Sequence, residues 1–295
     1  MNKNFIIYKV FFLLFIIVLN SPTHSKEKVL IITHAHSRPD FIELQVKTFN
    51  HFLKHGYEYV VFNDASNTDK REQIQQKCEE LGIQCILIPQ DIHAVPQTTN
   101  KRHAESIKFS FETLGFNQQR KIVLIDSDMF LVKPFSVFDY MGDNDFVGGL
   151  KQRSNHETQI EFSGPSLVFI NMANLENKET LNFNSGYVED LACDVGGHTY
   201  YYFRNNPKTK TFFYQIKPTH LIANEEEIVQ KWRYGSKTYG MELHADGNFL
   251  HYYAGGCNWP GYPAEYLNEK NHILNTYIDE VINTYTIVHK DSDEI

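Results

Sequence analysis

Between residues 28 and 125 the chain alternates short runs rich in β-branched residues with longer amphipathic stretches. Such alternation is typical of βαβ units, in which parallel strands form a sheet covered by helices. The sequence therefore predicts an α/β fold of Rossmann type, with a mainly parallel central sheet flanked by helices. The expected strands and helices alternate over residues 29–33, 41–55, 57–62, 69–81, 84–88, 101–114 and 121–125.

Beyond residue 145 the alternation is less regular, although apolar runs and helical spacing still occur. No linker, repeat or low-complexity segment interrupts residues 26–295, so we expect this stretch to form one domain. The expected strands here are 146–150, 166–170 and 249–253, and the expected helices lie near 191–203 and 273–285.

The N-terminal segment has the layout of a secretory signal peptide. Lys3 and Lys9 precede an unbroken apolar run at residues 10–19, and polar residues 20–25 follow that run. A helix of that run is only about 15 Å long, against a hydrocarbon layer of about 30 Å. Residues 1–25 are therefore predicted to be a cleaved signal peptide or, alternatively, a short type II signal anchor. In both cases the body is expected in the secretory lumen (ER or Golgi), in a periplasm or outside the cell.

The chain is acidic, with 36 Asp and Glu against 28 Lys and Arg and a formal net charge of −8. General binding to nucleic acid or to an anionic membrane surface needs a surplus of basic residues, so neither is expected. The expected partners are small molecules, or anionic ligands whose charge is met by a metal ion. The four cysteines, Cys78, Cys85, Cys193 and Cys257, are compatible with disulfides or with free thiols.

Two carboxylates directly follow the expected strand at 121–125, since Asp126 and Asp128 are separated only by Ser127. In α/β sheets ligands bind outside the carboxyl ends of the strands. Carboxylates at the rim of a core are unfavourable unless a positive group joins them. Asp126 and Asp128 can both reach one hard divalent cation, which can in turn bridge the phosphates of a nucleotide.

Two later segments carry further candidate side chains. His251 precedes Gly255 and Gly256, and an imidazole is a good ligand for Mn²⁺ while adjacent glycines let backbone amides approach phosphate oxygens. Alternatively, His251 is a hydrogen-bonded histidine of the core. Asp194 either caps the helix that follows it or binds hydroxyl groups of a ligand. The tyrosines at 200–202 are either core residues or a flat face for such a ligand.

These motifs, in this order, resemble those of GT-A-fold glycosyltransferases, with an arrangement similar to that of the glycogenin-like retaining enzymes. In that family a strand ending in Asp-x-Asp is followed by a strand of the Phe-Asn-Ser-Gly type. An Asp in an acidic helix-start motif comes next, and then a His with a Trp eight residues after it. The corresponding stretches here are 124–128, 162–171, Asp194, and His251 with Trp259.

The resemblance implies a mixed GT-A sheet, with residues 26–150 as the nucleotide and metal half and 151–295 as the acceptor half. It implies that Asp126, Asp128 and His251 bind Mn²⁺ or Mg²⁺, which holds the diphosphate of a sugar nucleotide. Arg102 is then a basic residue directed toward the nucleotide, or otherwise a solvated helix charge. The residues expected around the nucleotide are Thr33, His34, Asp64, Arg102, Asp126, Ser127, Gly255 and Gly256.

The resemblance implies transfer of a sugar from a nucleoside-diphosphate sugar, first of all a UDP-sugar, to a hydroxyl of a glycan, glycoprotein or glycolipid. Asp194 is the candidate catalytic base if the enzyme inverts; if it retains, as the resemblance suggests, Asp194 stabilises the transition state or positions the donor. A haloacid-dehalogenase-like phosphatase is an alternative, because residues 124–129 also look like its nucleophile strand. A non-catalytic carbohydrate-binding protein on a transferase scaffold is another.

Overall fold

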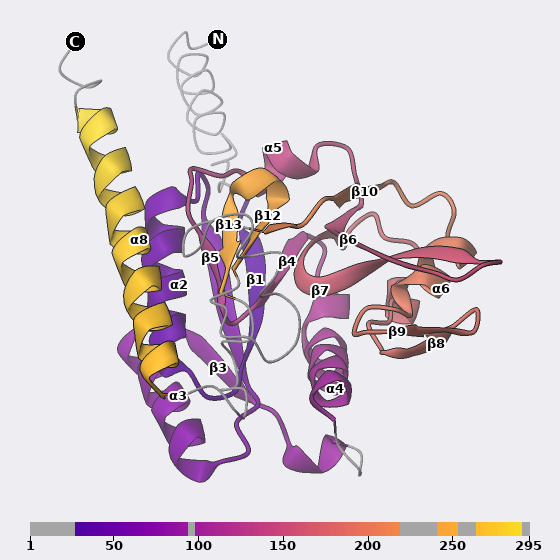
Figure 1. Ribbon diagram of the computed structural model, residues 1–295, viewed down its shortest axis with the longest axis horizontal. Helices are drawn as coiled ribbons and strands as arrows, with labels where there is room; N and C mark the ends of the chain where they lie inside the picture. Colours follow the sequence, from indigo (N-terminus) through magenta and orange to yellow (C-terminus); the bar gives the residue numbers. More distant parts are fainter. Residues whose placement is uncertain (1–26, 94–97, 219–240, 253–263, 291–295) are drawn as a thin grey trace, which may run out of the picture.

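In the computed structural model of the chain, the described residues are 27–93, 98–218, 241–252 and 264–290 (Figure 1). Their main element is a seven-stranded sheet of order β10-β6-β7-β4-β1-β2-β3. Strand β7 is antiparallel to both its neighbours, and the other pairs are parallel. The predicted α/β class with a mixed, mainly parallel sheet is thus confirmed. The strands are β1 (Val29–Ala35), β2 (Tyr57–Asn63), β3 (Gln84–Leu87), β4 (Lys121–Asp126), β6 (Phe146–Ser154), β7 (Gln159–Asn171) and β10 (Thr211–Tyr214).

Helices cover both faces of this sheet (Figure 1). Successive residues of β1 point to opposite faces, so Ile31 packs in the same cluster as Phe49 of α2, while Leu30 packs with Phe111 of α4. Each such buried side chain contributes about 1.5–3 kcal/mol. The helices are α2 (Pro39–Phe52), α3 (Thr68–Glu80), α4 (Thr99–Thr113), α5 (Val137–Met141), α6 (Thr199–Asn205) and α8 (Ala264–Lys290), with short 3-10 turns η1 (Gln90–Ile92), η2 (Gly115–Asn117), η3 (Lys178–Thr180) and η4 (Ala245–Gly247).

A second, four-stranded antiparallel sheet of order β11-β12-β13-β5 joins the main sheet directly after β4. Phe130 and Leu250 are directly opposite each other on β5 and β13, and both pack with Phe41 of α2 and Leu274 of α8. This core fixes the end of β13 beside the turn that links β4 to β5. The strands are β5 (Met129–Leu131), β11 (Lys217–Pro218), β12 (Glu242–His244) and β13 (Phe249–His251).

The helix expected near 191–203 was wrong in its first half. The segment begins as a strand of the small hairpin β8 (Gly186–Val188) and β9 (Leu191–Cys193), and helical structure starts only at Thr199. Gly196 interrupts the helix because its φ is +95°, and its backbone lies against the carbonyl of Ser163 in β7. The expected strand at 166–170 and the expected helix at 273–285 are parts of the longer elements β7 and α8.

Replacing Gly196 with alanine should lower the free energy of unfolding by clearly more than the same change at Gly82. Both glycines have a positive φ, which costs an alanine about 1–3 kcal/mol. A Cβ on Gly82 meets no atom within 4 Å, whereas a Cβ on Gly196 would lie 2.0 Å from the Ser163 carbonyl oxygen. Thermal and urea unfolding of the two variants would measure the difference, and equal losses would contradict the close packing of this loop on β7.

Cys78, Cys85 and Cys193 are free thiols in the structure. Cys78 at the end of α3 and Cys85 in β3 influence each other, and their interaction raises the pKa of the Cys78 thiol and lowers that of the Cys85 thiol. Cys257 and the predicted signal segment 1–25 lie outside the described residues. Among the helices within the described ranges, none combines the length and the apolar character that a membrane crossing requires.

Candidate metal centre

The ends of β4 and β13 bring two carboxylates and one imidazole together. Strand β4 ends at Asp126, Asp128 lies in the turn before β5, and β13 ends at His251. Nε2 of His251 lies 3.2 Å from Oδ1 of Asp128 and 3.8 Å from Oδ2 of Asp126. One donor atom of each residue lies within 4.8 Å of the other two. The structure therefore places the three predicted metal ligands at one point, which we call the Asp126–Asp128–His251 cluster.

The donor set of this cluster suits a divalent cation such as Mn²⁺ or Mg²⁺. Hard cations prefer carboxylate oxygens, and Mn²⁺ also accepts imidazole. Asp128 and His251 are only 5% and 6% exposed, so the charge of the Asp128 carboxylate lies where it needs a cationic partner. Neighbouring ligand atoms around a six-coordinate ion with bonds of about 2.1 Å are about 3 Å apart. The 3.2 Å between Asp128 and His251 is close to that separation.

A third carboxylate, which the sequence reasoning missed, lies on the other side of His251. Glu242 is directly opposite His251 in the β12–β13 ladder, and its Oε2 lies 3.1 Å from Nδ1 of the imidazole. Burial would lower the pKa of His251, but the charges of and hydrogen bonds to Asp128 and Glu242 raise it to about 10. Burial would raise the pKa of Glu242, but hydrogen bonds from His244 and His251 hold it far below its usual range.

The carboxyl end of β1 adds two polar residues beside the cluster. Thr33 is fully buried, and His34 follows it with Nε2 at 3.0 Å from the hydroxyl of Ser110 in α4. Burial, with the nearby His103 as a further cause, lowers the pKa of His34 to about 3, so its imidazole is neutral at physiological pH. His103, also from α4, was not predicted, and its Nε2 lies 3.4 Å from Oδ1 of Asp126. His103 thus lies beside the Asp126 carboxylate, and His34 is the partner of Asp126 in the β1–β4 ladder.

Asp64 and Arg102 form one buried network rather than two separate contacts. Arg102 donates from Nε to Oδ2 of Asp64 at 2.8 Å and from Nη2 to Oδ1 at 2.9 Å. The hydroxyl of Ser106 donates to Oδ2 of the same carboxylate at 2.9 Å, and Nε2 of His93 lies 2.8 Å from its Oδ1. Burial would raise the pKa of Asp64, but Arg102 and His93 lower it. Asp64 therefore holds Arg102 at the carboxyl end of β2, and Arg102 is not a solvated helix charge.

Asp194 lies on another part of the molecule, in the loop between β9 and α6 (Figure 1). Its Oδ2 lies 3.3 Å from Nζ of Lys151, and its Oδ1 accepts the N–H of Val195 at 2.8 Å. The residue at the start of α6 is His198, so the expectation that Asp194 caps this helix was wrong. The structure does not bring Asp194 into contact with the Asp126–Asp128–His251 cluster in any hydrogen bond or ion pair it records among the described residues.

The tyrosines at 200–202 divide between the two expected roles. Tyr202 belongs to the core, where its hydroxyl donates to the carbonyl of Glu176 at 2.6 Å, so it offers no face to a ligand. Tyr201 is 38% exposed, so its ring is accessible to a ligand.

Ser127, which stands between Asp126 and Asp128 in the chain, is buried at 8% exposure. Gly255, Gly256 and Trp259 lie outside the described residues.

Lys270 is a buried cation near the cluster that the sequence reasoning also missed. It is 4% exposed, and its Nζ lies 4.0 Å from the centre of the Tyr252 ring. Burial lowers its pKa to about 8, against the opposing charge of Asp128. Its spacing from Leu274 and Ile278, on the buried side of α8, was the available signal in the sequence.

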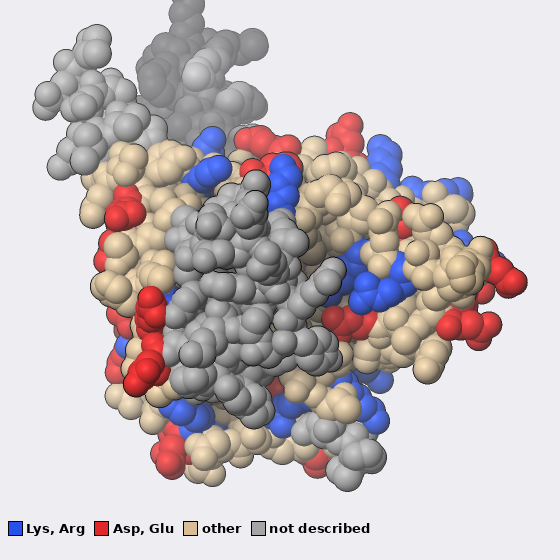
Figure 2. Space-filling model, in the orientation of Figure 1, with Lys and Arg blue, Asp and Glu red and all other residues tan. Residues whose placement is uncertain are grey.

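On the face of the molecule shown in Figure 2, acidic and basic side chains are interspersed over the described surface.

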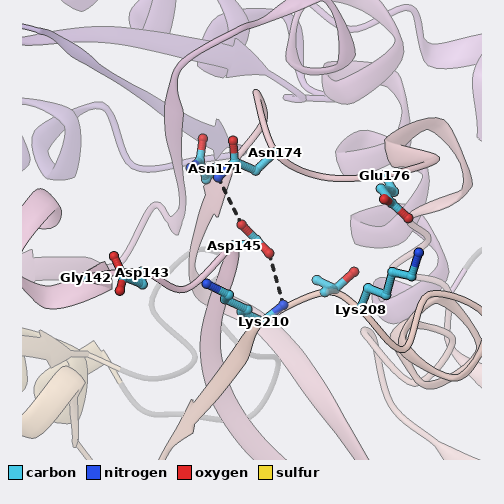
Figure 3. Close-up of a pocket in the computed structure, with 9 residues that line it drawn as sticks. Gly142, Asp143, Asp145, Asn171, Asn174, Glu176, Lys208 and Lys210 are labelled. Carbon is cyan, nitrogen blue, oxygen red and sulfur yellow. Dashed lines mark hydrogen bonds between the residues drawn. The ribbon is translucent and has the colours of Figure 1, made fainter.

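A separate polar cavity of about 440 Å³ lies between the end of β7 and the start of β6 (Figure 3). Asp145 at its centre accepts hydrogen bonds from the Asn174 side chain at 3.2 Å and from the Lys210 N–H at 3.0 Å. Asn171 pairs with Lys121 at the start of β4, whereas Asp126 is at the end of β4. This cavity therefore lies at the opposite end of the strands from Asp126. It is therefore distinct from the candidate metal centre.

No protein-family model matches the chain, and no curated protein matches it. Similar solved structures include a mannosyltransferase, PcManGT from Pyrobaculum calidifontis, in complex with GDP-Man and Mn²⁺, at 15% identity and a TM-score of 0.31, covering 45% of this chain and 40% of that one. The WbbM bifunctional glycosyltransferase matches at 10% identity and a TM-score of 0.35, covering 54% of this chain and 34% of that one.

A third similar structure is glucosyl-3-phosphoglycerate synthase from Mycobacterium tuberculosis with Mn²⁺ and UDP-glucose, at 17% identity and a TM-score of 0.30. That alignment covers 45% of this chain and 46% of the synthase. The chain thus spans less than half the length of each of these three glycosyltransferases.

Proposed function

We propose that the protein is a metal-dependent glycosyltransferase that moves a sugar from a nucleoside-diphosphate sugar, first of all a UDP-sugar, to an acceptor hydroxyl. The observation that carries this proposal is the Asp126–Asp128–His251 cluster. It lies just beyond the carboxyl end of a central strand, where α/β sheets bind their ligands. Two carboxylates and an imidazole there suit a cation that in turn binds a diphosphate.

In this proposal Asp126, Asp128 and His251 would hold Mn²⁺ or Mg²⁺, and the ion would offset the negative charge that develops on the departing diphosphate. The neutral His34 and the preceding Thr33, at the end of β1, would line the nucleoside pocket. Asp64 would act there by holding Arg102 in place through two hydrogen bonds. An acidic chain could thus bind an anionic donor through a metal instead of a broad basic surface.

Asp194 is the candidate for the acceptor side of the reaction. In an inverting enzyme it would take the proton of the acceptor hydroxyl, and in a retaining enzyme it would stabilise the transition state or position the donor. The glycogenin-like order of the motifs favours the retaining course. The acceptor would be a glycan, glycoprotein or glycolipid in the secretory lumen, reached through the predicted N-terminal signal.

A panel of UDP-, GDP- and CMP-sugars tests the proposal. One member should be hydrolysed slowly in the presence of Mn²⁺ and should raise the melting temperature. A ligand at a hundred times its Kd stabilises by about 2.7 kcal/mol, which is about 5–10 °C for a domain of this size. Both effects should vanish when EDTA removes the metal.

Two other results would contradict the proposal in favour of the alternatives. Release of phosphate from simple phosphoesters, without any response to a sugar nucleotide, would favour a phosphatase. Saturable glycan binding with no donor hydrolysis in Mn²⁺ would favour a carbohydrate-binding protein.

A further inference from the structure

We propose that Glu242 is a positioning residue that holds His251 in the tautomer whose Nε2 faces Asp126 and Asp128. Glu242 would do so by accepting the Nδ1–H of His251, while a hydrogen bond from His244 keeps the Glu242 carboxylate in place. The inference rests on the metal site of the proposed function, and it concerns metal affinity rather than the identity of the sugar donor.

The β12–β13 ladder gives the first step of the argument. Glu242 and His251 are direct partners in this antiparallel pair, so their side chains leave the same face of the small sheet. Oε2 of Glu242 lies 3.1 Å from Nδ1 of His251. Nε2 of the same ring lies 3.2 Å from Oδ1 of Asp128. The imidazole is thus held between two carboxylates, with one nitrogen committed to each.

The second step is a count of protons. An ionised Glu242 can only accept hydrogen bonds, so the nitrogen that faces it must carry a proton. When His251 loses one proton to become a ligand, Nδ1 keeps its hydrogen and the lone pair is left on Nε2. That nitrogen is the one directed at Asp126 and Asp128. Histidine ligands generally donate their other N–H to such a partner, which fixes the ring and increases its basicity.

The third step concerns what holds Glu242 itself. Its Oε2 also lies 3.3 Å from Nε2 of His244, which is 1% exposed on the same strand. Nδ1 of His244 lies 3.2 Å from the hydroxyl of the buried Tyr214, which lies in β10 of the main sheet. A chain of hydrogen bonds therefore anchors Glu242 to the main sheet, so its carboxylate has little freedom to leave His251.

The test measures Mn²⁺ binding to the full chain, without any sugar nucleotide, from the electron paramagnetic resonance signal of the free ion. Glu242→Gln and Glu242→Asp should each weaken Mn²⁺ binding by about 10–100-fold. Glutamine replaces a charged group that can only accept with a neutral amide that can also donate, and aspartate keeps the charge but is one methylene shorter. Glu161→Gln, which removes one exposed carboxylate from β7, is the control for net charge and should bind Mn²⁺ as the wild type does.

A second readout reports the contact between Glu242 and the ring directly. With diamagnetic Zn²⁺ bound, proton–nitrogen correlation spectra of His251 should show a sharp, slowly exchanging Nδ1–H in the wild type, because Glu242 accepts it, and faster exchange of this proton with water in both Glu242 variants. A positioning role requires this change, and a general loss of stability would not produce it.

Several outcomes would overturn the assignment. Wild-type affinity in both Glu242 variants would do so, and so would retention of affinity by the aspartate variant alone, because the charge and not the contact would then matter. Two metal ions per chain, with Glu242, His244 and His251 binding the second, would make Glu242 a ligand. A wild type without Mn²⁺ affinity would also contradict the role of Glu242, because there would be no metal ligand to position.

Mn²⁺ binding without any response to sugar nucleotides would instead contradict the proposed function and leave the role of Glu242 intact.

Discussion

Replacing Asp128 with asparagine should lower the Mn²⁺-dependent turnover of a sugar nucleotide by about 10³-fold or more. Asparagine has nearly the same volume, but it offers a neutral amide oxygen in place of an anionic ligand. A bound metal stabilises the charge of the departing group by several kcal/mol, and about 4 kcal/mol corresponds to about 10³-fold in rate. Initial rates with saturating donor, measured over a range of Mn²⁺ concentrations, would give the loss.

The fold should survive this substitution. The contact that joins the end of β13 to this turn is made by the backbone, where the Asp128 carbonyl accepts the Tyr252 N–H at 2.8 Å. Asp69→Asn makes the same change of charge on the exposed first turn of α3 and should keep wild-type rates. Wild-type turnover in Asp128→Asn would remove Asp128 from the metal site, and circular dichroism would show whether a loss of activity came from unfolding.

The first half of the fold could be predicted because local patterns decide it. The runs that became β1, β2 and β4 are rich in apolar and β-branched residues, and the stretches between them have helical spacing. Each of these signals lies within a few residues of its element. The second half was less predictable, because β9 takes a strand conformation through its pairing with β8 and the Gly196 loop depends on a contact with Ser163, far away in the sequence.

The same distinction applies to the candidate site. Asp126 and Asp128 stood out because they follow a buried strand without interruption. Glu242, His103 and Lys270 did not, since each becomes relevant only through a pairing or packing partner that is distant in the sequence. Glu242 is opposite His251 through the register of the β12–β13 ladder, which the sequence pattern does not reveal.

Raising the pH should strengthen Mn²⁺ binding about tenfold per pH unit, and this increase should continue beyond pH 7. A ligand histidine must lose a proton, so metal binding releases that proton wherever the free histidine is charged. Burial opposes the charged form of His251, but Asp128 and Glu242 favour it and raise the pKa to about 10. In the metal-free protein His251 therefore remains an imidazolium throughout the physiological range, and the proton on Nε2 competes with the metal.

Measurements of Mn²⁺ affinity at pH 6.5, 7.25 and 8.0 separate this mechanism from an ordinary histidine. A histidine with the usual pKa near 6.5 would give an affinity that levels off above pH 7, because the competing proton would already be lost. The raised pKa instead predicts a rise of about 30-fold over this interval, with about one proton released per ion. His251→Gln keeps a neutral oxygen ligand but cannot titrate, so its weaker binding should lack that proton release. If the wild type levels off as well, then the ion pairs with Asp128 and Glu242 do not control the charge of His251.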